Sequence, residues 1–262
     1  MNVCVACHHS AVHCGARACI SVQLCISCRC VCVFVRAPSR STCSAACGFF
    51  HTAAVTEDGS LYTWGLGAQG QLGHGDWDNR LLPLLCRDAA GDASHTPTTS
   101  VLRDVAVVAA GRGHTVATTQ DGAVWCWGSG ASGQLGTGDR ERRTRPTQLS
   151  RGLFEFAVAT MAACGADHTV VVTATGSVYT WGGNARGQLG LGDQDSRARP
   201  TAVHGCDSAV MVAAGDDHTL AVGRKPLSRV WSWGYGAQGA LGLGDTGDVI
   251  VPTPVLCLCD IP

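Results

Sequence analysis

The sequence predicts an all-β fold, a β-propeller of four blade-like repeats that forms a partial, open ring. Two observations lead to this expectation. Glycine is abundant, with 34 residues in a chain of 262, and glycine accepts the positive φ values that tight turns require. In addition, one short unit with the pattern of β-strands and turns occurs four times along the chain. Such units cannot bury their apolar faces alone, so they stack radially on one another.

Two residues with similar spacing in every unit define the repeat: a histidine in Gly-x-x-His-Thr and a tryptophan in Trp-Gly. The histidines are His51, His114, His168 and His218, and the tryptophans are Trp64, Trp127, Trp181 and Trp233. The distance between them is 13 residues in the first three units and 15 in the fourth. The glycine that opens the Gly-Gln-Leu-Gly block (Gly-Ala-Leu-Gly in the fourth unit) follows each tryptophan by 6 residues. The repeats therefore span about residues 43–104, 105–158, 159–208 and 209–256.

The first half of each unit predicts a hairpin. A strand of small apolar residues, such as 107–110, precedes the Gly-x-x-His-Thr block, and a second apolar strand follows it, as at 169–173. A turn with glycine comes next, at Asp58-Gly59, Asp121-Gly122 and Thr175-Gly176. Asp-Gly between two apolar runs is a strong hairpin signal because both residues tolerate positive φ.

The second half of each unit predicts a strand with one bulky face. Two aromatic residues stand two positions apart in every copy, as Tyr179 and Trp181 do, which places both rings on the same side of a strand. A Pro-Thr step, such as Pro146-Thr147, then leads toward the next unit. The aromatic face must pack against a neighbouring unit, which favours stacked blades.

These blocks resemble the repeats of the regulator of chromosome condensation family, over roughly residues 43–256. The resemblance implies a propeller, and propellers of this family typically close with more blades than the four found here. A Trp-Asp propeller fits poorly because Trp77-Asp78 is the only such dipeptide. A kelch propeller fits poorly because a Gly-Gly pair occurs in the units only at Gly182-Gly183.

The recurrent histidines and tryptophans are interpreted as structural. An active site usually needs one histidine in an asymmetric setting, whereas these recur in every unit beside a strand break, where a buried imidazole can bond the backbone. The Gly-Gln-Leu-Gly-x-Gly block lacks the Lys-Ser/Thr of a phosphate-binding loop. We therefore expect no catalytic residue, no metal ligand and no cofactor in the repeats.

Binding residues are sought where the repeats differ, because function in propellers lies in loops and insertions. One candidate is a basic loop that contains Arg140, Arg142, Arg143 and Arg145, although a merely solvated loop is the alternative. Another is the variable dipeptide inside each Gly-x-x-His block, which supplies Arg112, Asp216 and Asp217. The insertion from Arg87 to Arg103 is expected to be a surface loop.

Residues 1–42 differ from the repeats, since ten of the 16 cysteines precede residue 48. Cys4-x-x-Cys7 and Cys25-x-x-Cys28 have spacings that zinc could use, but the low-complexity setting favours a disordered leader. The apolar run 20–35 is short for a membrane span, and no basic region precedes it as in a signal peptide. Residues 257–262 are expected to form a tail.

The formal charge of −1 gives no general reason to bind nucleic acid or a membrane surface. The family resemblance implies two functions: a protein-interaction platform, or a guanine nucleotide exchange factor for a Ran-like small GTPase. We favour the platform because no wedge-like insertion is recognisable, and we expect a protein partner and a cytoplasmic or nuclear location. The photoreceptor branch of the family uses Gly-Trp-Arg-His-Thr, which is absent.

Overall fold

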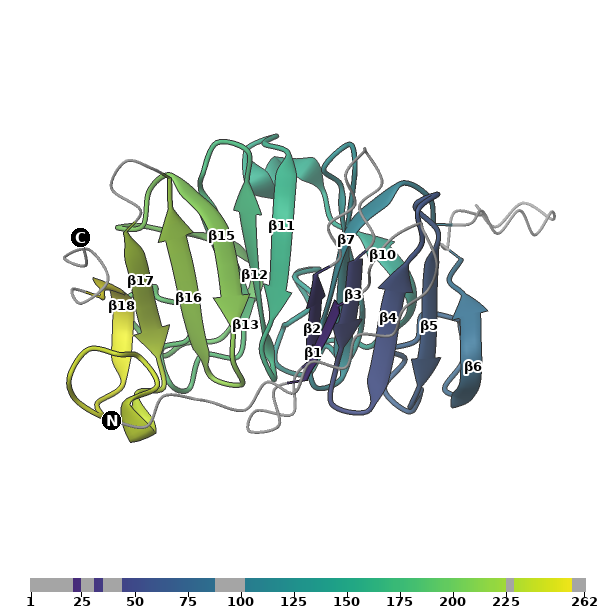
Figure 1. Cartoon of the computed structure of the whole chain (residues 1–262), viewed down its shortest axis with the longest axis horizontal. Coiled ribbons are helices and arrows are strands. Elements are labelled where there is room, and N and C mark those ends of the chain that lie inside the picture. The colour runs from purple at the N-terminus through teal and green to yellow at the C-terminus, as the bar shows by residue number, and fades with distance from the viewer. Residues whose placement is uncertain (1–20, 25–30, 35–43, 88–101, 225–228, 256–262) are drawn as a thin grey trace.

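The computed structural model describes residues 21–24, 31–34, 44–87, 102–224 and 229–255. Within them the chain forms four antiparallel sheets that follow one another side by side in an open arc (Figure 1). Helical structure in these residues is limited to two 3-10 turns, η1 (Arg151–Phe154) and η2 (Ala237–Gly239). The predicted all-β, partial propeller is confirmed.

Each sheet is one blade, with its strands in chain order from the inner to the outer edge. The first blade contains β3 (Ser44–Cys47), β4 (His51–Val55), β5 (Leu61–Gly65) and β6 (Arg80–Leu85). The second contains β7 (Val105–Ala110), β8 (His114–Thr119), β9 (Val124–Gly128) and β10 (Arg143–Gln148). The third contains β11 (Ala159–Cys164), β12 (His168–Thr173), β13 (Val178–Gly182) and β14 (Arg197–Val203). The fourth contains β15 (Ala209–Ala214), β16 (His218–Gly223), β17 (Val230–Gly234) and β18 (Val249–Pro254).

The predicted hairpin turns close the two middle strands of the first three blades. Gly59, Gly122 and Gly176 adopt φ values of 76°, 80° and 87° there. The prolines of the Pro-Thr steps lie in β10, β14 and β18, the outermost strands. An edge strand is where a residue without an N–H can be accommodated in a sheet.

The first sheet has two further strands, β1 (Ser21–Leu24) and β2 (Val31–Phe34), and β2 pairs with β3. Both lie in the segment predicted as a disordered leader. For these two stretches the structure has strands instead, and the alternation of cysteine and valine around Cys30-Val31-Cys32-Val33 is compatible with an extended backbone. The other leader residues, including both candidate zinc pairs, lie outside the described residues, as do 88–101 of the predicted loop and the tail.

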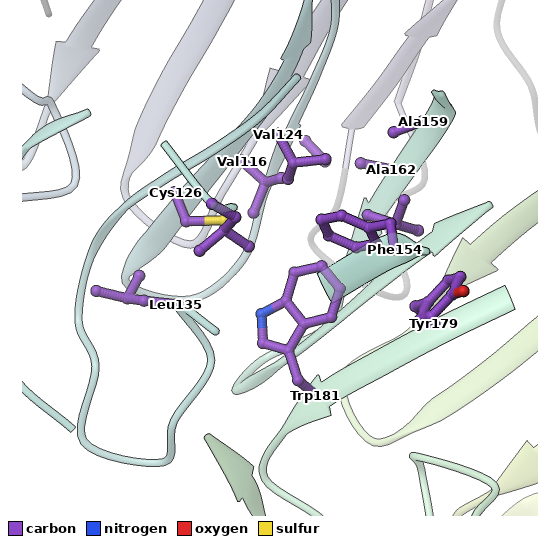
Figure 2. Close-up of a cluster of buried hydrophobic side chains, with 12 residues drawn as sticks. Val116, Val124, Cys126, Leu135, Phe154, Ala159, Ala162, Tyr179 and Trp181 are labelled. Carbon is purple, nitrogen blue, oxygen red and sulfur yellow. The ribbon is translucent and has the colours of Figure 1, made fainter. Parts of the chain in front are cut away.

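The apolar core lies between blades rather than within them. Figure 2 shows the cluster between the second and third blades, where Val116 and Leu135 meet Trp181 of the next blade. Phe154 of η1 completes it, with its ring centroid 5.3 Å from that of Tyr179. The indoles of Trp127, Trp181 and Trp233 are fully buried in the three successive joints. The aromatic faces therefore pack against neighbouring blades, as the repeat predicts.

A repeated set of hydrogen bonds crosses each joint. Between the first two blades, the Gln71 carbonyl oxygen accepts from the Thr115 hydroxyl at 2.8 Å and from the Trp127 indole N–H at 2.9 Å. The Gln134 carbonyl oxygen accepts the equivalent hydrogen bonds from Thr169 and Trp181. The Gln188 carbonyl oxygen accepts them from Thr219 and Trp233. Each tryptophan can pack this closely because the neighbouring loop has a glycine: a Cβ on Gly136 would lie 2.8 Å from the Trp181 nitrogen.

The repeat histidines complete the joints. His51 Nε2 lies 2.8 Å from the Thr115 hydroxyl, and His114 and His168 make the equivalent contacts at 3.1 and 3.0 Å. Because the threonine gives its one proton to a carbonyl, the imidazole donates from Nε2, and burial disfavours its charged form. Burial lowers the pKa of His51 to about 4 and that of His114 and His168 to about 3. These histidines hold blades together.

Candidate interaction surface

The four Gly-x-x-His loops form one continuous strip along the inner edge of the arc. Each joins the innermost strand of its blade to the next strand, so all four lie at the same end of the blades. Main-chain hydrogen bonds connect neighbouring loops, from Phe49 N to Gly111 O, from Arg112 N to Ala166 O and from Ala166 N to Asp216 O. We name this strip, residues 48–50, 111–113, 165–167 and 215–217, the Gly-x-x-His rim. It brings the variable dipeptides together on one face.

The first part of the rim is aromatic and then basic. Phe49 and Phe50 expose 45% and 62% of their surface although both are large and apolar. Their ring centroids are 4.3 Å apart. The Arg112 guanidinium lies 6.0 Å from the Phe49 ring centroid on one side and 3.9 Å from the Asp167 carboxylate on the other. An apolar anchor and a cation are therefore adjacent on an exposed surface.

The other end of the rim is acidic. Asp216 is exposed, and Asp217 accepts a hydrogen bond of 3.1 Å from the Gln188 side-chain amide. Partial burial raises the pKa of Asp217, the nearby Asp216 carboxylate raises it further, and the positive charge of Arg112 opposes the shift. Like charges held this close favour a cationic group from a partner.

Two residues beside the acidic end were not singled out by the sequence reasoning. The Arg186 guanidinium lies 4.7 Å from the ring centroid of Tyr235 and 3.5 Å from the Asp248 carboxylate. Tyr235 is adjacent to the rim because its N–H donates to the Asp217 carbonyl oxygen. The available signal was that the residue after Trp-Gly varies among the repeats, from Leu66 to Tyr235.

Only Arg140 and Arg142 of the predicted basic loop lie in a loop, because Arg143 and Arg145 belong to the strand β10. None of the four lies on the rim, and two of them already have intramolecular contacts. Arg143 pairs with Asp139 at 2.6 Å, and Arg80 with Asp76 and Arg197 with Asp193 repeat this pair in other blades. The Arg145 guanidinium lies so close to Gly75 of the first blade that a Cβ there would be 2.5 Å from it. Arg140 and Arg142 remain exposed. A partner would therefore meet two of these arginines rather than four.

Other site classes have less support in the described part of the chain. No group of three or more histidine, cysteine or acidic side chains is arranged there to hold a metal ion. No helix among those residues is long and apolar enough to cross a membrane. The repeat histidines and tryptophans, considered for chemistry because they recur, lie in the joints, except for His218 and Trp64 of the two end blades. The exposed, blade-specific chemistry lies on the rim.

Comparison with known proteins places these features in context. The family described as RCC1-like domain matches residues 25–260. The ultraviolet-B receptor UVR8 of Arabidopsis thaliana is 37% identical over 205 residues, which cover 78% of this chain and 43% of the receptor. The probable E3 ubiquitin-protein ligase HERC3 of Homo sapiens is 34% identical over 214 residues, 80% of this chain and 19% of the ligase. The chain thus spans less than half the length of these curated relatives.

Among solved structures, that of Prp20p from Saccharomyces cerevisiae superimposes with a TM-score of 0.67 over 91% of this chain and 61% of its own. Its sequence identity is 23%. At that identity the likeness shows the fold, which is the propeller described above. The structure of Prp20p is reported together with its binding properties to Gsp1p and histones.

Proposed function

The chain belongs to the RCC1-like domain family, and from this premise we propose that it is a protein-interaction platform that binds its partner along the Gly-x-x-His rim. The observation that carries the proposal is the contrast between joints and rim. The joints repeat the same histidine, threonine, glutamine and tryptophan contacts from blade to blade. The rim differs in every blade, and its exposed side chains are Phe49, Phe50, Arg112 and Asp216. Surface chemistry that varies on a repeated scaffold is typical of recognition.

The order of groups on the rim indicates the chemistry of the partner. Phe49 and Phe50 offer the apolar anchor, because aromatic side chains that become fully desolvated contribute most to an interface. Asp216 and Asp217 at the other end complement a basic side chain. Exposed charge pairs contribute little affinity but set orientation and association rate. We therefore infer a partner segment with an apolar residue at one end and lysine or arginine at the other.

A small GTPase is a second candidate partner, and one observation favours it. Prp20p, which shares the fold, is described by its binding to Gsp1p and histones. In the proposed function a GTPase would be bound without accelerated nucleotide exchange, and no residue of this chain is assigned a catalytic role.

The rim is tested by charge reversal and anchor removal in the full chain. The variants are Phe49→Ser with Phe50→Ser, and Arg112→Glu. Arg103→Glu is the matched control because it reverses an exposed arginine at the end of β7 opposite the rim. Proteins retained from cell extract by each immobilised form are quantified by mass spectrometry. We expect partners of the wild type to be retained by the control and lost by both rim variants. Equal retention by all forms would overturn the rim as the binding surface.

The choice between platform and exchange factor needs a separate measurement. The chain is added in catalytic amounts to a Ran-type GTPase loaded with fluorescent GDP, and nucleotide release is followed. We expect release at the intrinsic rate. Clear acceleration would establish the exchange-factor alternative instead.

A further inference from the structure

The two end blades of the described arc expose opposite halves of the joint that occurs three times inside it. In an internal joint, one blade supplies the histidine and the glycine-rich loop, and the next supplies the threonine, the tryptophan and the outer strand. The first blade has the threonine, the tryptophan and the outer strand on its open side, which is the side that faces no other blade of the described arc. The fourth blade has the histidine and the glycine-rich loop on its own open side.

The open side of the first blade is apolar. Trp64 is partly exposed, whereas the equivalent Trp127, Trp181 and Trp233 are fully buried. Within the described part of the chain, the Trp64 indole N–H has no hydrogen-bond partner. Leu81 and Leu82 in β6 expose 95% and 77% of their surface. Exposed apolar residues gathered on one blade face are characteristic of an interaction site.

The exposed leucines occupy positions that contact the preceding blade elsewhere. Leu82 is equivalent to Arg145 and Arg199, whose guanidinium groups lie against Gly75 and Gly138. Leu81 is equivalent to Thr144, whose carbonyl oxygen accepts from Gly75 N at 2.8 Å. The remaining blade shows that aliphatic side chains fit this position: Ile250 lies against Gly187, and Val251 Cγ1 is 3.8 Å from a Cβ placed on Gly192.

The open side of the fourth blade has the complementary vacant positions. Gly239 and Gly244 are equivalent to Gly70 and Gly75, and a Cβ on either would meet nothing within 4 Å. The exposed Ala240 stands at the position of Gln71 and presents a carbonyl oxygen where Gln71 accepts two hydrogen bonds. His218 is only partly buried, in contrast to the other three repeat histidines.

We propose that the fourth blade of one copy docks on the first blade of a second copy of this chain, and so forms a fourth joint of the same kind. In that joint the Ala240 carbonyl oxygen accepts from the Thr52 hydroxyl and the Trp64 indole of the second copy. His218 Nε2 donates to the same Thr52. Leu81 and Leu82 cover Gly239 and Gly244. The inference rests on the joint residues and not on the side chains of the rim, so it does not depend on the proposed function.

The geometry of association follows from the two different halves. A contact between unlike surfaces is head-to-tail, and it either closes a ring or extends into longer assemblies. Unlike the internal joints, this one joins separate chains and must offset lost translational freedom. We therefore expect self-association that depends on protein concentration.

The test uses the full chain with one half of the joint blocked at a time, measured by sedimentation velocity over a range of concentrations. Leu81→Asp with Leu82→Asp blocks the first-blade half, and Leu220→Asp blocks the fourth-blade half, since Leu220 is partly exposed beside His218 in β16. Phe156→Asp is the control, because the Phe156 side chain is 80% exposed and lies away from both halves of the joint. Circular dichroism melts establish that each variant is folded. If Leu220→Asp does not fold, His218→Ala replaces it, with an expected weakening of about fivefold.

We expect the wild type and the control to associate, and each blocked variant alone to remain monomeric. An equimolar mixture of the two blocked variants should form a one-to-one dimer, because each contributes the half that the other lacks. A wild type that stays monomeric at all concentrations would overturn the proposal. So would folded blocked variants that fail to combine, or a loss of association in one variant only.

Discussion

The Trp181 indole N–H donates a hydrogen bond of 2.9 Å to the Gln134 carbonyl oxygen across the joint between the second and third blades. Thr169 donates to the same oxygen from the other side at 2.9 Å. All these groups lie in the buried interior of the joint. A single main-chain carbonyl thus connects the aromatic strand and the histidine-threonine pair of one blade with the glycine-rich loop of its neighbour.

Replacing Trp181 with phenylalanine should destabilise the chain by about 1–3 kcal/mol, because it removes a buried hydrogen bond and part of a well-packed ring. Trp64→Phe is the matched control: the same residue of the repeat, partly exposed and without a side-chain hydrogen bond in the described residues. We expect it to cost clearly less. The free energy of unfolding in urea at low protein concentration checks both, and equal losses would contradict the role given to the joint.

Stability should fall as the pH drops below about 6.5. His51, His114 and His168 have pKa values lowered by burial to about 4, 3 and 3 in the fold. The unfolded chain therefore takes up protons before the folded chain does. Each such histidine should remove about 1.4 kcal/mol of stability per pH unit between its two pKa values.

Urea unfolding at several pH values between 6.5 and 4.5 measures this slope. His114→Gln should reduce the slope by one proton. A free energy of unfolding that is flat over this range would show that the buried histidines are not neutral in the fold.

Removal of the Phe154 ring should destabilise the second joint by about 3–5 kcal/mol in the Phe154→Ala variant. The ring is 2% exposed and packs edge-on against Tyr179. Phe156→Ala removes the same side chain two residues later, where 80% is exposed. We expect that variant to change the melting temperature little. Similar losses in both variants would mean that η1 stabilises the chain through its backbone rather than through this ring.

The candidate surface was only partly predictable from the sequence. The dipeptides were found because they interrupt a repeat, and Arg112, Asp216 and Asp217 do lie on the rim. Arg143 and Arg145 belonged to a run of positive charge, and the sequence could not show that one pairs with Asp139 and the other lies against Gly75. Such contacts depend on which loop of the neighbouring blade faces the arginine, and a linear pattern does not contain that information.

The sequence by itself determined the blade. The spacing of 13 residues from His51 to Trp64, kept in the next two copies and lengthened to 15 in the fourth, specifies strands, turns and the face that carries the rings. These follow from local φ preferences and the period-two alternation of a strand. Only the tertiary structure decided what the repeated residues do. The Gln134 carbonyl oxygen becomes a shared acceptor, and His114 a neutral donor, only when two blades are brought together. The strands and turns of a blade follow from local sequence. Each joint forms between residues of two consecutive repeats, such as Gln134 and Trp181, which lie 47 positions apart in the chain.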